Sequence, residues 1–469
     1  MLQNFDIPIF QTIQKVSEKL GMPAYVVGGY VRDMILGRPT KDIDILVVGN
    51  GPDFAKALAD LIPAKSSLTI FKNFGTANLK WEGHELEFVG ARKESYHQHS
   101  RKPLVEIGTL EDDLGRRDFS INALAISLNA ADYGQIIDLF NGMQDLKNGL
   151  IRTPLAPGIT FSDDPLRMMR AIRFAAQLGF KVNADTLQSI SEQAQRIAII
   201  SQERIADELH KIVSAPLPSI GFKLLHDTGL LAIIFPELLA LEGVRTVDNR
   251  SHKDNFYHTL QVLDNIAPYT SDLWLRWAAI LHDIGKPATQ RYDQNSGWTF
   301  HGHEVVGARM VAKIFRRMKF PMNEKMKFVE KLVLLHLRPI ALTNEVTDAA
   351  IRRLIVDAGD DLEALFTLCR ADITSKNQIK VQKYLERFDE VQVKIKEVEE
   401  KDALRNWKPP ITGEIIMEVF GLSPSRTVGE IKDQVREAIL NGDIPNNYDA
   451  AYELMLKIGE GLGYLPKYK

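Results

Sequence analysis

The chain has 469 residues, a length that predicts about three domains of ~150 residues each. Its 45% hydrophobic and 25% charged content is typical of a soluble globular protein, and its net charge of −3 excludes a surface covered in positive charge. No apolar run approaches the ~20 residues of a membrane span, and a signal pattern is absent. Because the single cysteine, Cys369, excludes an internal disulfide, we expect a cytoplasmic protein.

The first 150 or so residues alternate short apolar runs with helical segments, a pattern that predicts a mixed α/β domain. We expect its small sheet to be mixed and largely antiparallel, with helices packed on it. Helices are expected at about 7–20 and 31–37, and strands at 24–29, 43–48, 76–81 and 86–91. A run of basic residues comes next, which is a candidate nucleic-acid surface: Arg92, Lys93, Arg101, Lys102, Arg116 and Arg117.

From about residue 160 onward, strand patterns nearly vanish. The segment 161–180 has apolar residues at helical spacing, and so does most of the chain beyond it. The pair Pro409-Pro410 ends a charged helix expected at 379–404, so a small helical domain should come after it. We therefore expect an α/β head (1–150), a helical neck (151–245), a helical body (246–380) and a helical tail (381–469).

Candidate chemistry begins with Gly28-Gly29, which follows a predicted strand and precedes a predicted helix. Such a turn lets phosphate oxygens meet backbone N–H groups, and Arg32, one turn later, could brace a triphosphate. Asp42 and Asp44 are two residues apart in the next strand, so their carboxylates share one face. Two carboxylates there would repel each other strongly unless a divalent cation lay between them.

Mg²⁺ is the cation that prefers one or two carboxylates together with substrate phosphates. Two such ions could activate an attacking 3′-hydroxyl and stabilise the leaving pyrophosphate. An isolated Asp-x-Asp pair more often faces solvent, but apolar neighbours and the preceding turn favour the metal site here. Glu87 is the expected third carboxylate, although Glu85 lies on the same face of its strand.

These residues resemble the class II tRNA nucleotidyltransferases, which comprise the CCA-adding enzymes and related bacterial poly(A) polymerases. The resemblance continues through segments 110–125, 136–152, 162–176 and 201–209. It implies that Arg117 and Asp118 contact the nucleotide and that Asn122 supports their turn. It also implies a hinge between head and neck through Asp138, Gly142 and Asp145.

In the family's base-reading motif, Asp164 and Arg167 would recognise the nucleobase. An acceptor and a donor three residues apart on one helix face complement the Watson–Crick edges of cytosine and adenine, and Arg170 would reach phosphate or base one turn further on. Guanine and uracil present the opposite order and would leave buried charges unpaired. The family usually has Glu where this chain has Asp163.

A second constellation, His282-Asp283 followed by Gly285-Lys286, resembles the HD-domain phosphohydrolases. The matching metal ligands would be His258, His282, Asp283, His303, His336 and Asp372, with His301 as a competitor of His303. Imidazoles and carboxylates on several helices suit Fe, Mn, Ni, Co or Mg. Some relatives with this domain act on phosphomonoesters or 2′,3′-cyclic phosphates. Segment 411–455 resembles the tRNA-contacting tail of family members that carry the domain.

The expected activity is untemplated addition of C, C and A to the tRNA 3′ end from CTP and ATP. Segment 71–79 resembles tRNA-specific members, and the connection 92–113 is long enough for the loop associated with the final A. CC addition, A addition and poly(A) synthesis remain same-class alternatives. A phosphohydrolase with an RNA-binding head is the alternative from a different class. Oligomeric state stays open.

Overall fold

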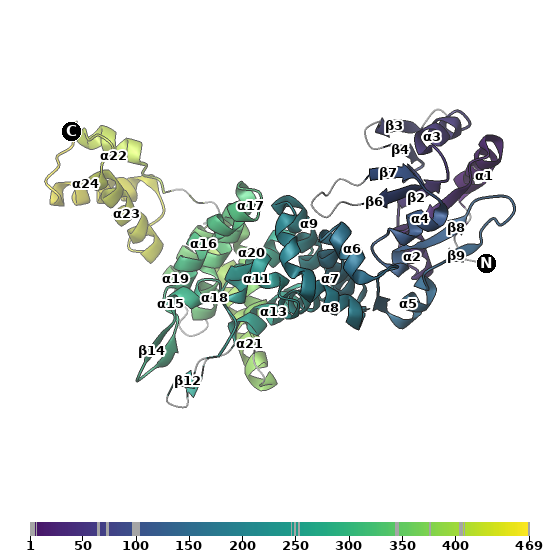
Figure 1. Ribbon diagram of the computed structural model, residues 1–469. Coiled ribbons are helices and arrows are strands. Elements are labelled where there is room, and N and C mark those ends of the chain that lie inside the picture. The colour runs from purple at the N-terminus through teal and green to yellow at the C-terminus, as the bar shows by residue number, and fades with distance from the viewer. Residues whose placement is uncertain are drawn as a thin grey trace. The chain divides into compact units, whose positions relative to one another are not determined.

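The computed structural model describes the chain except for residues 1–4, 6, 63–65, 72–74, 96–103, 245, 248–249, 252–253, 343–346, 375–376, 403–406, 408 and 468–469. It divides into two compact units, residues 1–236 and 237–469 (Figure 1). The finer division into head, neck, body and tail remains a prediction. Arg101 and Lys102 of the basic run lie outside the described residues. No helix in the described part of the chain is long and apolar enough to cross a membrane.

The head is built on a seven-stranded sheet in the order β3-β4-β5-β2-β1-β8-β9. Its strands are β1 (Ala24–Val27), β2 (Asp42–Val47), β3 (Ser67–Phe71), β4 (Thr76–Trp81), β5 (His84–Gly90), β8 (Leu124–Ser127) and β9 (Ile136–Asp138). Only β2 and β5 pair in parallel, and the other neighbours are antiparallel. The sequence-based prediction of a small mixed sheet with helices is therefore confirmed.

The expected helices and strands of the head are present at nearly the predicted bounds. The helices are α1 (Pro8–Leu20), α2 (Gly29–Ile35), α3 (Gly51–Ala59), α4 (Leu110–Gly115) and α5 (Gly142–Asn148), and a separate hairpin pairs β6 (Arg92–Ser95) with β7 (Leu104–Ile107). Helix α3 packs on β4 and β5. The other face of the sheet carries a buried cluster that includes Val27, Leu46 and Leu114. Two packed faces hold the central strands, and with them the predicted carboxylates, in fixed register.

The rest of the first unit is helical. Its elements are α6 (Pro157–Asp163), α7 (Leu166–Leu178), α8 (Ala184–Gln193), α9 (Gln202–Val213), α10 (Pro218–Asp227) and α11 (Leu230–Ile234), with short strands β10 (Leu150–Ile151) and β11 (Lys181–Val182). The helical pattern of segment 161–180 corresponds to two helices, α6 and α7, so Asp164 and Arg167 do not lie on one helix as expected. The helical run breaks at Asp164, which is extended (φ −140°, ψ 101°), because a residue before proline is driven out of the α region.

The second unit is a helical bundle with a three-helix tail after it. The bundle contains α13 (Asn255–Ile266), α14 (Leu273–Leu281), α15 (Lys286–Thr289), α16 (His303–Arg317), α17 (Glu324–Leu335), α18 (Leu337–Leu342), α19 (Asp348–Ala358), α20 (Leu362–Asp372) and α21 (Gln378–Asp402). The tail comprises α22 (Gly413–Phe420), α23 (Arg426–Asn441) and α24 (Tyr448–Gly461), which share an apolar cluster around Ile416, Ile431 and Met455. Most of the predicted HD ligands lie at helix ends in the bundle.

Candidate active site and metal centre

The parallel pairing of β2 and β5 brings the predicted head carboxylates to one face of the sheet. Asp44 lies opposite Glu87 in the register, and Asp42 lies opposite Glu85. Glu85 forms an ion pair with Lys80 at 2.9 Å on the neighbouring strand. Glu87 is therefore the better placed partner for Asp44. These head carboxylates do not bring three ligand atoms within 4.8 Å of one another.

Asp44 is the most buried of these carboxylates, and its environment disfavours its charge. Burial raises the pKa of Asp44, and the adjacent Asp42 raises it further, while Arg117 lowers it. Partial desolvation and the carboxylate of Asp44 also raise the pKa of Glu87. Excess negative charge held in a desolvated place is what a bound cation would neutralise, so the residues fit a divalent metal ion.

This electrostatic environment predicts a stability effect. Because the pKa of Asp44 is higher in the folded state than in the unfolded state, its ionised form destabilises the metal-free fold at neutral pH. Asp44→Asn should therefore raise the melting temperature without divalent cations at pH 7. The gain should shrink as the pH falls through the raised pKa and wild-type Asp44 protonates. Thermal unfolding between pH 4 and 8 tests this, and a lower melting temperature for Asp44→Asn at pH 7 would contradict it.

Gly28 belongs to the Gly28-Gly29 turn and lies beside the carboxylate of Asp44. It adopts φ +76° and caps α2, and a Cβ added there would lie 2.7 Å from Arg117 Nη1 and 3.3 Å from Asp44 Oδ2. Glycine is required for both the backbone conformation and the close approach. Asp113, which is fully buried, holds the Arg117 guanidinium at 3.2 Å and Arg116 at 2.5 Å. Asp113 is a positioning carboxylate that was not predicted from the sequence.

A buried hydrogen-bond network connects the remaining predicted nucleotide-binding residues of the head. Asn122 accepts from Arg32 Nη1 at 2.7 Å and donates to Asp118 at 2.9 Å. Asp118 in turn receives Nε and Nη2 of Arg170, at 2.7 and 2.5 Å. Although burial raises the pKa of Asp118, Arg170 and Asn122 together hold it below its ordinary value. Arg170 thus anchors Asp118, and Arg32 is held in a bidentate contact with Asp33.

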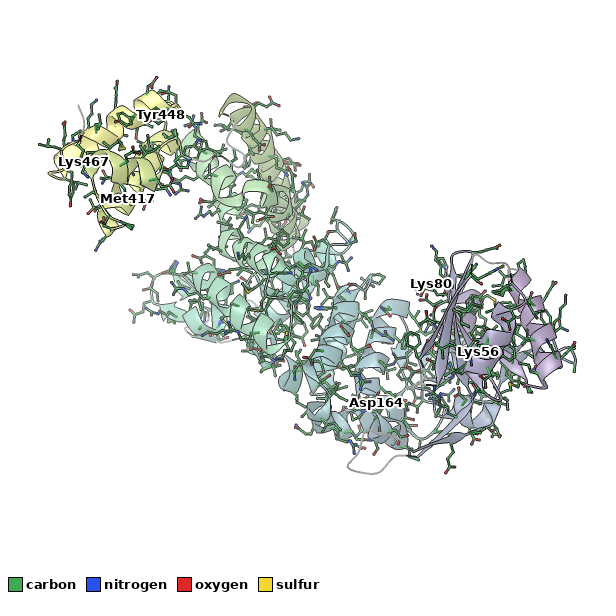
Figure 2. The ribbon with its side chains drawn as sticks, turned by 90° about the horizontal axis from the view of Figure 1, so that it is seen from above. Lys56, Lys80, Asp164, Met417, Tyr448 and Lys467 are labelled. Carbon is green, nitrogen blue, oxygen red and sulfur yellow. The ribbon has the colours of Figure 1, made fainter. Side chains whose placement is uncertain are left out.

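The predicted base-reading pair lies at the junction of α6 and α7, where Figure 2 labels Asp164. Because the helix breaks at Pro165, Asp164 precedes α7 and Arg167 lies in its first turn. Asp164 and Arg167 form no ion pair with each other. Asp164 accepts from Leu166 N at 3.1 Å and from Arg204 Nη2 at 2.9 Å, and Arg167 donates to Arg116 O at 2.8 Å. The Asp164 carboxylate and the Arg167 guanidinium therefore do not neutralise each other.

The predicted catalytic and nucleotide-binding residues, except Asp42 and Glu87, line one cavity of about 590 Å³. Among the described residues, seven arginines and three aspartates line it. Five lining residues were not predicted from the sequence: Leu166, Arg173, Phe174, Gln177 and Arg204. Phe174 lies under three guanidinium groups, those of Arg32, Arg170 and Arg173, at 4.2 to 5.6 Å from the ring centre. The surplus of positive charge and a π-face suit a nucleoside triphosphate.

The spacing of α7 contained a signal for some of the missed residues. Arg167, Arg170, Phe174 and Gln177 recur at intervals of three or four, which is one face of a helix. Arg204 comes from α9, in segment 201–209, and no local pattern joins it to Asp164. The predicted hinge residues also make contacts: Asp138 accepts from Gly142 N at 2.7 Å, and buried Asp145 accepts from Ser120 at 2.5 Å.

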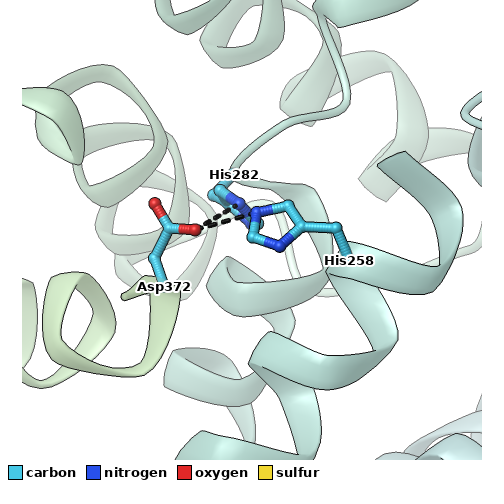
Figure 3. A group of neighbouring side chains, drawn as sticks. All are labelled: His258, His282 and Asp372. Carbon is cyan, nitrogen blue, oxygen red and sulfur yellow. Dashed lines mark ion pairs between the residues drawn. The ribbon is translucent and has the colours of Figure 1, made fainter. Parts of the chain in front are cut away.

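In the second unit, the six predicted HD residues converge in the bundle. They form two groups whose ligand atoms lie within 4.8 Å of one another: His258, His282 and Asp372, shown in Figure 3, and Asp283, His303 and His336. His303 is buried and belongs to a group, whereas His301 is exposed and belongs to neither. The structure thus places His303 at the centre.

Asp283 joins the two groups. Its Oδ2 lies 3.2 Å from His282 Nε2 and 3.6 Å from His258 Nε2, and its Oδ1 lies 3.2 Å from His303 Nε2. Burial lowers the pKa of His282, but the carboxylates of Asp283 and Asp372 outweigh burial and raise that pKa to about 10. Among the described residues, the buried His282 Nε2 has no hydrogen-bond partner. Converging imidazoles and carboxylates and an unsatisfied ring nitrogen fit a bound metal ion.

Comparisons with known proteins agree with this architecture. Residues 24–152 match the poly A polymerase head domain, 179–241 the probable RNA and SrmB-binding site of polymerase A, and 255–365 the HD domain. The Bacillus stearothermophilus CCA-adding enzyme in complex with CTP has the same fold, with a TM-score of 0.68, 24% identity, and coverage of 98% of this chain and 99% of that one.

Curated relatives extend the comparison to sequence. The multifunctional CCA protein of Haemophilus influenzae is 36% identical over 316 residues, which are 64% of this chain and 71% of that protein. The A-adding tRNA nucleotidyltransferase of Deinococcus radiodurans is 32% identical over 366 residues, which are 75% of this chain and 80% of that protein. The head fold and its site define a nucleotidyltransferase. More particularly, the chain belongs to the tRNA nucleotidyltransferase family that contains the CCA-adding and A-adding enzymes.

Proposed function

We propose that this chain adds C, C and A to the 3′ end of tRNA from CTP and ATP, without a nucleic-acid template. The observation that carries the proposal is the single arginine-rich cavity that Asp44, Arg117, Asp164 and Arg167 share. It combines a carboxylate for metal with a charged pair suited to the Watson–Crick edges of cytosine and adenine. Relatives named for CCA addition support it. We expect the tRNA 3′ end, CTP and ATP as partners.

We assign the phosphoryl-transfer chemistry to the face of β2 and β5 that carries Asp42, Asp44 and Glu87. Asp42 and Asp44 would hold Mg²⁺, which supplies charge neutralisation at the triphosphate, and Glu87 would accept the proton of the attacking hydroxyl. Gly28, Gly29 and the anchored arginines would hold the phosphates. Asp118 and Asn122 keep Arg32 and Arg170 in place and form the wall of the site.

Three tRNA substrates test the proposal and separate the same-class alternatives. With Mg²⁺ and labelled CTP or ATP, tRNA that lacks CCA should take up C, tRNA that ends in C should take up C, and tRNA that ends in CC should take up A. Incorporation of A alone on the CC-ended tRNA would identify an A-adding enzyme, like the relative from Deinococcus radiodurans. Long A tracts on any RNA would identify a poly(A) polymerase. No incorporation at all would overturn the proposal.

We propose a second activity for the bundle: metal-dependent hydrolysis of phosphomonoesters or cyclic phosphates. The six converging ligands support it, and the bridging position of Asp283 favours two cations over one. A bound metal would lower the pKa of a water nucleophile and polarise the phosphoryl group. We infer that the metal is Mg²⁺ or a transition metal. Carboxylate ligands suit Mg²⁺, and imidazole ligands suit transition metals.

Asp283→Asn should abolish this hydrolysis and leave nucleotide incorporation within about twofold of wild type, because the two sites share no residue. Hydrolysis of a chromogenic phosphomonoester and of a 2′,3′-cyclic nucleotide measures the first effect, and the labelled-nucleotide assay measures the second. Metal content per chain after dialysis distinguishes one cation from two. Loss of both activities in a folded variant would refute separate sites, and no hydrolysis by the wild type with any of these metals would overturn the second activity.

A further inference from the structure

Three of the four histidines at the HD centre share one arrangement: Nδ1 lies against the main-chain carbonyl three residues earlier. The pairs are His282 with Ala279 O at 2.8 Å, His303 with Phe300 O at 2.8 Å, and His336 with Val333 O at 2.6 Å. A carbonyl oxygen can only accept a hydrogen bond, so Nδ1 must carry the proton. In the neutral form that a metal ion requires, each of these rings therefore has its proton on Nδ1 and its lone pair on Nε2.

His258 is different, because its Nδ1 lies 3.1 Å from a hydroxyl, Thr374 Oγ1. Its Nε2 lies 2.9 Å from Asp372 Oδ1, the contact drawn in Figure 3. A carboxylate only accepts, so without a cation the neutral ring of His258 carries its proton on Nε2, and Nδ1 accepts from the Thr374 hydroxyl. Binding a metal through Nε2 requires the other tautomer, in which Nδ1 donates.

We propose that Thr374 is a positioning residue that lets His258 exchange tautomers as metal binds. Its hydroxyl donates to Nδ1 while His258 bonds Asp372, and it accepts from Nδ1 once Nε2 ligates a metal. One N–H bond breaks at Nε2 and one forms at Nδ1, with solvent carrying the proton, so the ring stays neutral throughout. A main-chain carbonyl could support only the second state. The inference rests on the proposed metal centre.

The position of Thr374 in the chain is consistent with this role. Thr374 follows Asp372 by two residues at the end of α20, so one short segment contacts both nitrogens of His258. His258 itself is buried in the first turn of α13. In this way His258 keeps a hydrogen-bond partner at each nitrogen while the centre lacks metal, and neither buried atom is left unsatisfied.

The test is the affinity of the full chain for Co²⁺ alone, measured by calorimetric titration together with the visible absorption of bound Co²⁺. An Asp44→Asn background removes binding at the head. Thr374→Val should weaken the affinity about 10- to 100-fold, the usual cost of losing a partner of a ligating histidine. Thr374→Ser keeps the hydroxyl and should stay within about threefold of wild type. Thr367→Val is the matched control, because Thr367 lies in α20, the helix that precedes Thr374, and its hydroxyl bonds the Glu363 carbonyl instead of a histidine.

Equal Co²⁺ affinity for Thr374→Val and Thr367→Val would overturn the role of Thr374 while leaving the metal centre intact. Failure of the parent to bind Co²⁺ would instead overturn the metal centre and the inference with it. If Thr374→Val does not fold, ¹⁵N-histidine spectra of the wild-type chain without and with Zn²⁺ decide the question. The proton of His258 should move from Nε2 to Nδ1, and a proton that stays on one nitrogen contradicts the proposal.

Discussion

Replacing Asp44 with asparagine is expected to lower nucleotide incorporation into tRNA by roughly 1,000-fold or more, because metal charge stabilisation contributes several kcal/mol to phosphoryl transfer. Asp44 lies on the central strand β2 and lines the cavity. Its pKa is raised by burial and by Asp42, so a bound cation would stabilise its ionised form. Asparagine preserves the shape and removes the charge. The measurement is single-turnover incorporation of labelled C into tRNA lacking CCA, at saturating Mg²⁺.

The neighbouring strand supplies the controls. Glu85→Gln removes an exposed carboxylate that pairs with Lys80 and should change the rate by less than about fivefold. Glu87→Gln removes the carboxylate opposite Asp44 and should lower the rate by about 100-fold or more, the usual contribution of a positioned base. A larger loss for Glu85→Gln than for Glu87→Gln would refute the assignment of Glu87. Near-normal incorporation by Asp44→Asn would refute the metal site itself.

Replacing Asp164 with alanine is expected to weaken the discrimination between CTP and UTP by roughly 10- to 100-fold, because hydrogen bonds to charged groups contribute about 1.5 to 3 kcal/mol. Asp164 would accept from the amino group of cytosine or adenine, and uracil offers a carbonyl there. The KM for CTP should rise less than the discrimination falls, since other residues hold the triphosphate. Ratios of kcat/KM for the four nucleoside triphosphates measure both effects.

Asp163→Asn is the matched control for this experiment. Asp163 ends α6 next to Asp164 but does not line the cavity. Its substitution should leave the order of nucleotide preference unchanged. Strict preference for C and A in Asp164→Ala would contradict the base-reading role and direct attention to Arg167.

Where a local pattern sets the structure, the sequence predicted it well. Alternation of apolar residues placed β2 and β5, and the shared face of Asp42 and Asp44 results directly from strand geometry. The six HD residues converge in the bundle as the resemblance implied. Pro165 also carried a usable signal, since the restriction on the preceding residue breaks the helix at Asp164.

Contacts made by tertiary packing could not be predicted from the sequence. Arg204 reaches Asp164 from another helix, 40 residues away in the chain, and no periodicity connects the two. The buried Asp113 orders Arg116 and Arg117, yet in the sequence it is one acid in an acidic helix start. Thr374 gains its importance only from its 3.1 Å approach to His258. Such residues become visible only once the chain is folded.

Because the HD ligands come from several helices, metal binding at this centre depends on the folded state of the bundle. The ligands lie on or directly beside α13, α14, α16, α17 and α20, so no isolated fragment of the unit retains the full set. A cation that requires all of them binds the native bundle and not its unfolded chain, and mass action then couples metal concentration to unfolding. Release of metal during heating should therefore coincide with loss of bundle structure, and chelators should accelerate proteolysis of this unit.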